Sequence, residues 1–262
     1  MSYEKITVDT VGDVAIVRLN DPAALNAVSL RMIDEINDAL DVEVGRSRAL
    51  ILTGTGRAFC AGANLGGGLS IVGEDGLADT GASLESHVNP LMNRLRGLSI
   101  PWISAVRGPA AGVGCSLAVA ADIAVASETA YFLQAFVRIG LVPDGGSSWL
   151  LTRAVGRARA MEMMLLGERI PAAQALEWGL IARVVADGEL DDAALKIAQG
   201  LAEGPTRSLA MIRQAAWAAA DDDWEQVLAN ERRLQRDAGN TQDHAEGVAA
   251  FQEKRAARFT GA

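Results

Sequence analysis

Apolar and polar residues alternate twice near the start of the chain. The alternation covers residues 3–11 and then Val14–Leu19, with Gly12-Asp13 between the two segments. This pattern predicts two strands joined by a tight hairpin. From Ser29 to Leu40 the apolar residues recur three and four positions apart instead. A helix with one buried face is therefore expected there, with Ser29 as its N-cap.

The middle of the chain continues with strands and helices in alternation. Apolar runs predict three buried strands, at 49–53, 102–106 and 123–126. A glycine-rich turn at 108–114 and a helix at 115–121 connect the last two. Strands that alternate with helices are typical of an α/β protein.

Residues 66–83 are rich in Gly and Asp without periodicity, so an irregular surface segment is expected there. After residue 146 the chain is expected to be mainly helical. We expect an α/β core over residues 1–190 and a C-terminal helical subdomain over 191–262. The remaining predicted elements are a helix at 84–98 in which Pro90 marks a kink or a late start, helices at 149–155, 158–166 and 172–178, a strand at 180–185, and a last amphipathic helix at 243–259.

Composition and charge narrow the possible functions. The chain has 262 residues, 50% of them hydrophobic, which suits a full-sized core. Its net charge of -9 disfavours nucleic acids and anionic membranes as partners. Neither a signal peptide nor a membrane-spanning run is recognisable, so a cytoplasmic protein is expected. The two cysteines, Cys60 and Cys115, and the distant His87 and His244 predict neither a disulfide framework nor a metal site.

Two segments of small residues place backbone amides where another group can approach closely. They are residues 59–64, Phe-Cys-Ala-Gly-Ala-Asn, and residues 112–116, Gly-Val-Gly-Cys-Ser. The second segment begins a predicted helix, whose free N–H groups favour a negatively charged oxygen. Close packing of a helix on a strand requires the same small residues, so the glycines alone leave both a structural role and an oxyanion site open.

Several longer motifs, taken in order, resemble the crotonase superfamily of enoyl-CoA hydratases and isomerases. They are ALNA at 24–27, RAFCAGAN at 57–64, GPAAGVGCSLAVAADIAVAS at 108–127, IGLVPDGGSSWLLTRAVG at 139–156 and FQEKRAARF at 251–259. The resemblance spans nearly the whole chain, and residues 137–163 also resemble the bacterial ring-1,2-epoxyphenylacetyl-CoA isomerases. It implies a spiral of ββα units that binds an acyl-CoA thioester. No separate cofactor is expected, since coenzyme A is part of the substrate.

In that family two backbone amides hold the thioester oxygen as it becomes negative. Matching the motifs residue by residue puts these amides on Ala61 and Val113. Many relatives have glycine at the second position, but a backbone donor tolerates valine. The resemblance also implies a homotrimer or a dimer of trimers, in which the helical subdomain covers its apolar face.

The same matching implies residues that border coenzyme A. Asn64 stands where the family commonly has aspartate, which leaves the contact to ribose or adenine open. For Phe251 and Lys254, in the charged terminal helix, a solvated surface is the alternative. The six residues are Ala24, Leu25, Ala63, Asn64, Phe251 and Lys254.

The two catalytic glutamates of the family's hydratases have no counterpart in this chain. Their positions fall on Ser116 and Phe136, and neither side chain serves as a carboxylate base. With Leu141 and Trp149 these residues form the expected acyl pocket. One acid remains, Asp144, where related isomerases carry a catalytic aspartate. Asp before Gly-Gly is also a good turn or N-cap residue, which is the structural alternative.

Three functional hypotheses follow from the sequence. We expect an isomerase that shifts a double bond or rearranges an acyl-CoA, in which Asp144 moves the proton and two amides stabilise the enolate. Apolar neighbours are expected to raise the pKa of Asp144. A hydratase with an atypical site and an acyl-CoA binder without activity are the alternatives, because one scaffold hosts several functions.

Overall fold

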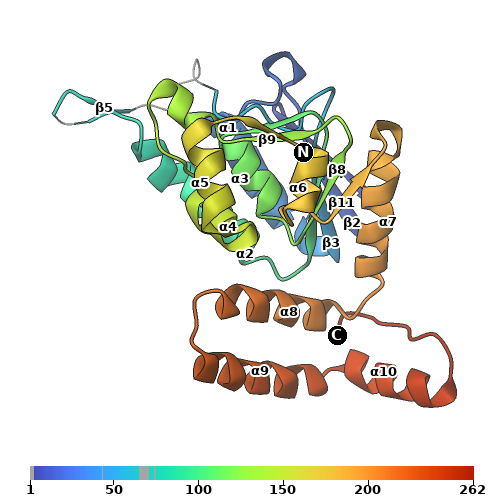
Figure 1. The fold of residues 1–262 in the computed structure, drawn as a ribbon. Coiled ribbons are helices and arrows are strands. Elements are labelled where there is room, and N and C mark those ends of the chain that lie inside the picture. Colours follow the sequence, from blue (N-terminus) through green and yellow to red (C-terminus); the bar gives the residue numbers. More distant parts are fainter. Residues whose placement is uncertain (1–2, 43, 65–70, 74) are drawn as a thin grey trace.

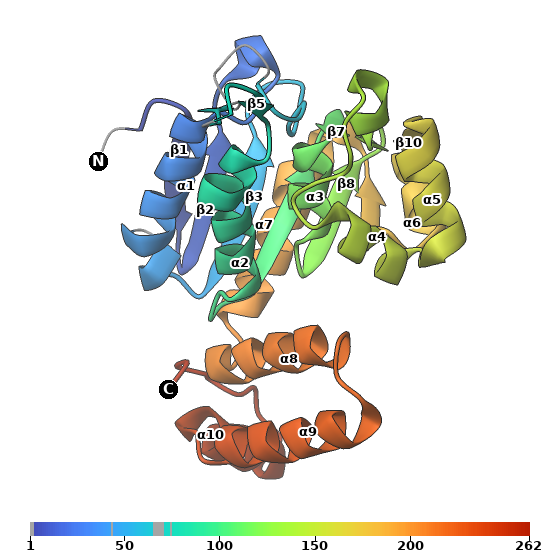
Figure 2. The same cartoon turned by 90° about the vertical axis from the view of Figure 1, so that its left-hand side faces the viewer.

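A six-stranded sheet forms the centre of the core (Figures 1 and 2). The computed structural model describes residues 3–42, 44–64, 71–73 and 75–262. Apart from the antiparallel hairpin of the first two strands, neighbouring strands are parallel. In spatial order the strands are β1 (Ile6–Val11), β2 (Val14–Leu19), β3 (Ala49–Gly54), β6 (Trp102–Val106), β8 (Ile123–Ser127) and β11 (Arg183–Val185).

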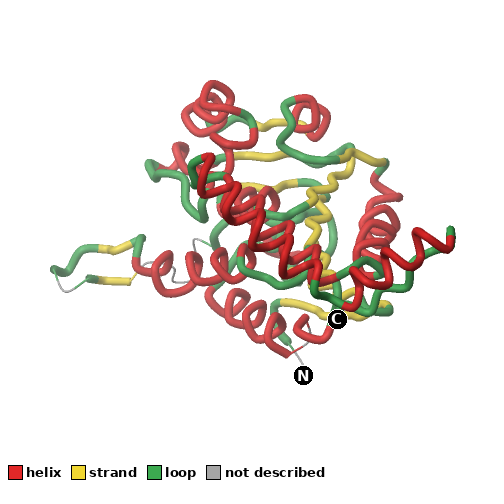
Figure 3. The backbone as a smooth tube through the Cα atoms, turned by 90° about the horizontal axis from the view of Figure 1, so that it is seen from below, coloured by secondary structure: helices red, strands yellow, loops and turns green. Residues whose placement is uncertain are grey.

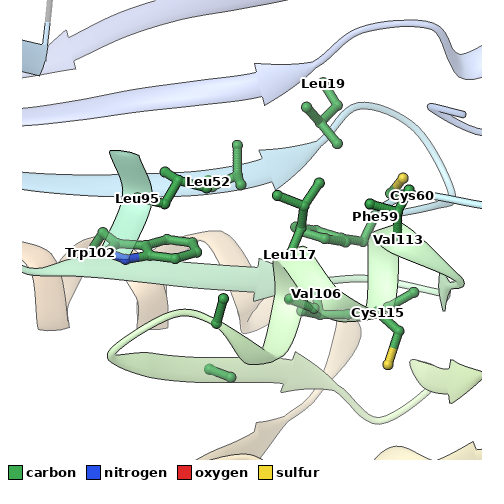
Figure 4. Packing of buried hydrophobic residues seen from close by; sticks show 14 of the residues in the cluster. Leu19, Leu52, Phe59, Cys60, Leu95, Trp102, Val106, Val113, Cys115 and Leu117 are labelled. Atoms are coloured by element: carbon green, nitrogen blue, oxygen red, sulfur yellow. The ribbon is translucent and has the colours of Figure 1, made fainter. Parts of the chain in front are cut away.

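Three helices cover one face of this sheet. The predicted helix after Ser29 is confirmed, and its apolar stripe, including Met32 and Ile36, is buried. Figure 4 shows Leu95 and Leu117 of the neighbouring helices packed among the side chains of the sheet. Burial of such side chains is the main stabilising contribution to the fold. The helices are α1 (Leu30–Val42), α2 (Asn89–Arg96) and α3 (Val113–Val119).

The opposite face of the sheet is covered by α7 (Leu190–Ala202) (Figures 1 and 2). Leu190 and Ala194 of this helix form a second core cluster with Ile51 and Ile103 of the sheet. The expected boundary at residue 190 would have assigned α7 to the helical subdomain. The structure instead places α7 in the core, so the helices that leave the core begin after it.

A second, three-stranded sheet supplies the other half of the spiral. None of its strands was expected from the sequence, because each has only three residues and the strand at 109–111 falls in the Gly-, Pro- and Ala-rich turn. Two successive ββα units result, β6-β7-α3 and β8-β9-α4, and the expected spiral architecture is confirmed. The sheet has the order β10 (Arg169–Pro171), β9 (Tyr131–Leu133), β7 (Pro109–Ala111), and the helices that follow in the chain are α4 (Ser147–Ala154), α5 (Gly156–Leu166) and α6 (Ala172–Glu177).

The last three helices form a layer beside the amino ends of the parallel strands (Figure 1). Arg213 of the first helix is buried and donates to Asp122 Oδ2 at 2.6 Å and to Leu95 O at 3.0 Å. Because Asp122 directly precedes β8, this ion pair attaches the layer to the core. The helices are α8 (Thr206–Ala219), α9 (Trp224–Gly239) and α10 (Gln242–Glu253).

The terminal helix ends earlier than the sequence pattern predicts. Lys254 has a φ of 54° and is the left-handed C-cap of α10, so the expected helix to residue 259 is wrong. The chain then folds back, and the N–H groups of Thr260 and Gly261 donate to the Asp243 carboxylate at 2.7 and 2.8 Å. The left-handed C-cap thus ends the helix, and the contacts to Asp243 hold the returning chain against the first turn of α10.

The segment expected to be irregular contains one short hairpin. β4 (Ile71–Val72) pairs with β5 (Ala78–Asp79), and the hairpin projects from the body of the molecule (Figure 3). Residues 65–70 and 74 of this prediction lie outside the described residues. The helix that follows begins with a π-helical turn at Leu84–Val88, and α2 starts with Pro90 in its first turn, so Pro90 marks a late helix start as expected.

Candidate active site

The Phe-Cys-Ala-Gly-Ala-Asn segment lies between the turn that contains Leu25 and strand β7. On one side, Ala61 N–H donates to Leu25 O at 3.0 Å and Val28 N–H donates to Gly62 O at 2.7 Å. On the other side, Cys60 forms a parallel bridge to β7. The structure thus brings the predicted coenzyme A residues of the two segments together.

Asn26 holds this turn in place, although the sequence analysis assigned it no role. Its fully buried side chain accepts from Asp21 N at 2.9 Å and donates to Thr55 O at 2.9 Å and Ala58 O at 2.7 Å. Leu25 and Asn26 both have left-handed φ angles, of 53° and 56°. The signal in the sequence was an amide side chain within an apolar stretch, since buried polar groups need partners.

The structure corrects one of the two predicted oxyanion amides. The Ala61 N–H is already used by Leu25 O, so it is not available to a substrate oxygen. The next candidate is Ala63, which pairs with Val28 in parallel while Asn64 N–H donates to Val28 O at 2.8 Å. In such a pair the N–H of Ala63 points away from Val28, and it has no hydrogen-bond partner among the described residues.

The amino end of α3 packs directly on this segment. A Cβ on Gly114 would lie 2.7 Å from Cys60 Cβ, and a Cβ on Gly62 would lie 3.1 Å from Ala111 O, so both close approaches require glycine. Figure 4 shows Val113 at the start of α3 beside Cys60. As the first residue of the helix, Val113 has an N–H without a partner among the described residues. Two unused amides therefore belong to adjacent segments.

Asp144 lies in the turn that leads into α4. Its side chain is partly buried, and its Oδ1 atom is inaccessible to water and has no hydrogen-bond partner among the described residues. Burial raises the pKa of this carboxyl to about 6, which confirms the expected direction. The N-cap of α4 is Gly146 and has no side-chain capping bond, so the Asp144 carboxylate does not serve as the helix cap.

The two residues that the resemblance matches with hydratase glutamates, Ser116 and Phe136, are both buried. Ser116 Oγ lies 3.0 Å from Asp144 O and 2.6 Å from Ser147 Oγ. A Cβ on Gly112 would lie 3.6 Å from the Cζ atom of Phe136, so its ring closes the space beside the start of α3. These two positions therefore present a hydroxyl that is already bonded and an aromatic ring.

The similarity to known proteins agrees with this geometry. The model of the enoyl-CoA hydratase/isomerase family matches residues 9–262. The chain belongs to this family. The 1,2-epoxyphenylacetyl-CoA isomerase of Escherichia coli is 45% identical over 247 residues, which are 93% of each chain. A probable enoyl-CoA hydratase of Rhodobacter capsulatus is 41% identical over 261 residues, 100% of each chain.

Solved structures of the family have the same fold over the full length. An enoyl-CoA hydratase from Bacillus anthracis superposes with a TM-score of 0.91 at 30% identity, covering 99% of this chain and 100% of that chain. A protein from Streptomyces coelicolor that is named a putative enoyl-CoA hydratase superposes with a TM-score of 0.91 at 32% identity, covering 100% of this chain and 96% of that chain. The protein is therefore an enzyme of a family that acts on acyl-CoA thioesters.

Two predicted acyl-pocket residues differ in their surroundings. Leu141 is exposed on the turn before Asp144. Trp149 stacks on Trp217 of α8 with ring centroids 5.3 Å apart, and its Nε1 donates to Asp221 Oδ1 at 3.1 Å. Trp149 therefore links α4 to the helical layer, and it also lines a cavity of about 160 Å³ that borders Gly145 and Gly146 behind the Asp144 turn.

Phe251 and Lys254 do not approach the other predicted coenzyme A residues within this chain. They lie at the end of α10, in the layer beside the amino ends of the parallel strands. Val113 lies at the opposite edge of the sheet, beyond the carboxyl ends of these strands (Figures 1 and 4). Phe251 is 85% exposed at the rim of an apolar groove of about 1040 Å³ between α8, α9 and α10. A contact with coenzyme A would require a second subunit.

No cluster of three or more His, Cys, Asp or Glu side chains suitable for a metal ion occurs among the described residues. No helix there is long and apolar enough to cross a membrane. The two cysteines are fully buried, and burial raises the pKa of each thiol to about 12, so neither is a reactive thiolate.

Proposed function

We propose that this enzyme is an acyl-CoA isomerase that uses Asp144 as a single acid and base. The observation that carries the proposal is the state of this carboxyl group: partly buried, with an unpartnered oxygen and a pKa raised to about 6. A structural aspartate would have its hydrogen bonds satisfied, whereas a proton-transfer group needs an available oxygen and a pKa near the working pH.

The reaction requires a place for negative charge on the thioester oxygen. The N–H groups of Ala63 and Val113 are the available donors on the two adjacent segments. In a β,γ-unsaturated acyl-CoA the Asp144 carboxylate takes the α proton, the C–H electron pair moves into a dienolate, and the two amides bind its oxygen. The protonated carboxyl then returns the proton to the γ carbon, so the double bond moves and no other reactant is consumed.

The walls of the site favour isomerisation over hydration. Hydration by the two-carboxylate route requires one group to activate water and another to deliver a proton. Phe136 and Ser116 occupy the positions from which hydratases supply those carboxylates. The apolar Phe136 ring also favours an apolar or aromatic acyl group near the amides, in keeping with the ring substrate named for the Escherichia coli relative.

A hydratase with an atypical site is the second candidate, because the Rhodobacter capsulatus relative is named a probable enoyl-CoA hydratase. Incubation with 3-hexenoyl-CoA and crotonyl-CoA in deuterated water, followed by mass spectrometry, separates the two. An isomerase converts 3-hexenoyl-CoA to 2-hexenoyl-CoA, which chromatography separates from it, and adds no oxygen; deuterium at the γ carbon marks exchange of the transferred proton. A hydratase adds water to crotonyl-CoA, and a binder without activity changes neither compound.

The role of Asp144 is tested by Asp144→Asn. The amide cannot accept the α proton, so isomerisation of 3-hexenoyl-CoA is expected to fall by at least about 10³-fold. Binding of crotonyl-CoA, measured by calorimetry, is expected to change little because the side chain does not contribute an oxyanion donor. Near-normal turnover by this variant would reject Asp144 as the acid and base.

A further inference from the structure

Three buried side chains, from α3, from α4 and from the residue that follows β9, connect to the backbone of Asp144. Gln134 Nε2 donates to Ser147 Oγ at 3.1 Å, Ser147 Oγ lies 2.6 Å from Ser116 Oγ, and Ser116 Oγ donates to Asp144 O at 3.0 Å. Gln134 and Ser116 are 0% exposed and Ser147 is 1% exposed. None of these contacts is needed to form α3 or α4, since both helices have their own backbone hydrogen bonds.

Ser116 Oγ has three oxygen neighbours: Asp144 O at 3.0 Å, Gly112 O at 3.4 Å and Ser147 Oγ at 2.6 Å. Each serine hydroxyl has a single proton, and a carbonyl oxygen only accepts. The proton of Ser116 is therefore directed to a carbonyl, of which Asp144 O is the nearer, and Ser147 donates to Ser116. With Gln134 Nε2 donating to Ser147 Oγ, the arrangement runs from Gln134 to Ser147, from Ser147 to Ser116, and from Ser116 to the carbonyl oxygen of Asp144.

We propose that Ser116, supported by Ser147 and Gln134, is a positioning residue that holds the Asp144 turn against the start of α3. This inference rests on the proposed function of Asp144. Ser116 lies one helical turn after Val113, so the bond from Ser116 ties the backbone of the acid and base to the helix that supplies an oxyanion amide. The relay thereby sets the distance between the carboxyl group and the thioester oxygen.

This arrangement gives the serine a role different from that of the glutamate it replaces. Ser116 does not exchange protons with the substrate, because its single proton is engaged by Asp144 O and its hydroxyl oxygen accepts from Ser147. A second hydrogen bond to the same carbonyl comes from Ser147 N–H at 3.0 Å. Two donors from two helices thus hold one backbone oxygen beside the proton-transfer group.

The test compares Ser116→Ala with Ser104→Ala, using 3-hexenoyl-CoA as the substrate. Ser104 is a matched control: it is equally buried, and its Oγ donates to Ala118 O of the same helix at 2.7 Å, away from the Asp144 turn. Ser104→Ala loses one buried hydrogen bond, whereas Ser116→Ala loses its bond to Asp144 O and the bond from Ser147 Oγ, so both variants are expected to lose thermal stability, Ser116→Ala the more. Only Ser116→Ala is expected to lower kcat, by about tenfold, with KM changed less than about threefold.

A second readout is the pH at which activity falls to half. Loss of the anchor lets water reach Asp144, so its pKa is expected to decrease from about 6 toward the ordinary value. The acid limb of the Ser116→Ala rate profile then moves to lower pH, while that of Ser104→Ala stays in place. An unchanged kcat and an unchanged acid limb in Ser116→Ala would overturn the proposal.

The relay also predicts how two substitutions combine. Ser147→Ala is expected to reduce kcat less than Ser116→Ala, and the double variant is expected to be no slower than Ser116→Ala alone, because both act on one contact. Independent, additive losses would overturn the relay. If Ser116→Ala does not fold, Ser147→Ala alone still tests the relay, because an unchanged kcat in this variant would overturn it. Asp144→Asn, assayed in parallel, separates the relay from the proposed role of Asp144. If Asp144→Asn is inactive while Ser116→Ala has a normal kcat, only the relay fails. If Asp144→Asn keeps its turnover, the proposed function fails as well.

Discussion

A Cβ atom on Gly145 would lie 3.0 Å from the Cβ of Ser116 and 3.3 Å from Cγ2 of Val113. The residue after Asp144 is therefore in direct contact with the first turn of α3. Gly145 also has a φ of +58°, which favours glycine. Sterics and backbone conformation together define where the Asp144 turn can lie.

We expect Gly145→Ala to lower kcat by at least about tenfold, because the new methyl group pushes the turn away from α3. The strained backbone should also cost about 1 kcal/mol in the free energy of unfolding. Gly140→Ala is the control: Gly140 has a φ of +71° but nothing within 4 Å of its Cβ position. It should show the stability loss without the loss of kcat, measured by urea unfolding and steady-state kinetics. Equal kcat losses in both variants would contradict the contact argument.

The raised pKa of Asp144 predicts the pH dependence of activity. The carboxylate is the active base, so protonation of Asp144 removes activity as the pH falls through about 6. An ordinary aspartate would lose activity only near pH 3.9. Below the midpoint, kcat/KM for 3-hexenoyl-CoA should fall about tenfold per pH unit. A midpoint near the ordinary aspartate value would contradict the burial of this group.

Histidine must be excluded as the source of that midpoint, because its ordinary pKa is about 6.5. The chain has two histidines, His87 and His244. Replacing both with glutamine should leave the midpoint unchanged, since neither residue is part of the site. A shift of the midpoint in this double variant would assign the titration to a histidine.

The same pKa predicts that Asp144→Asn stabilises the fold at neutral pH. The folded state binds the Asp144 proton more strongly than the unfolded chain does, so this carboxyl contributes stability below its unfolded pKa. That contribution is lost as the pH rises from about 4 to about 6. The amide does not ionise, so the variant should be more stable by on the order of 1–2 kcal/mol near pH 7.5. Urea unfolding should show a smaller gain near pH 4.5, and a gain independent of pH would contradict the linkage.

The resemblance to the crotonase superfamily supplied the positions of Asp144, Val113, Ser116 and Phe136 in the candidate site. The residue types then limited what each can do, because Asp144 can accept a proton whereas Ser116 and Phe136 cannot act as carboxylate bases. The start of a helix at Val113 is indicated by the apolar spacing to within two residues. The local pattern alone left Asp144 open between a catalytic residue and a turn residue.

The choice between Ala61 and Ala63 depended on tertiary structure instead. Both are small residues in one short segment, and each supplies the same N–H group. Ala61 is excluded only because its N–H donates to Leu25 O at 3.0 Å. That carbonyl belongs to the turn held by Asn26, which lies far from Ala61 along the chain. The place of α7 in the core could not be predicted for the same reason, because the residues that it packs against belong to strands distant along the chain.

The ion pair between Arg213 and Asp122 makes a final prediction about how the helical layer is attached. Arg213 also donates to Leu95 O and Leu98 O, so one side chain holds α8 on the amino ends of the strands. Burial raises the pKa of Asp122 even though the arginine acts in the opposite direction. Arg213→Ala leaves the partly buried Asp122 carboxylate without its partner, which should cost about 2 kcal/mol in the free energy of unfolding near pH 7.5.

The loss should become smaller at low pH, because protonation of Asp122 removes the uncompensated charge. Arg153→Ala is the comparison: its pair with Asp221, 3.0 Å long, joins α4 to the turn after α8 but is exposed to solvent. Its removal should leave the urea midpoint nearly unchanged, since screened surface pairs contribute little. Equal destabilisation by the two variants, or a loss in Arg213→Ala that does not vary with pH, would contradict the view that the buried pair anchors the helical layer.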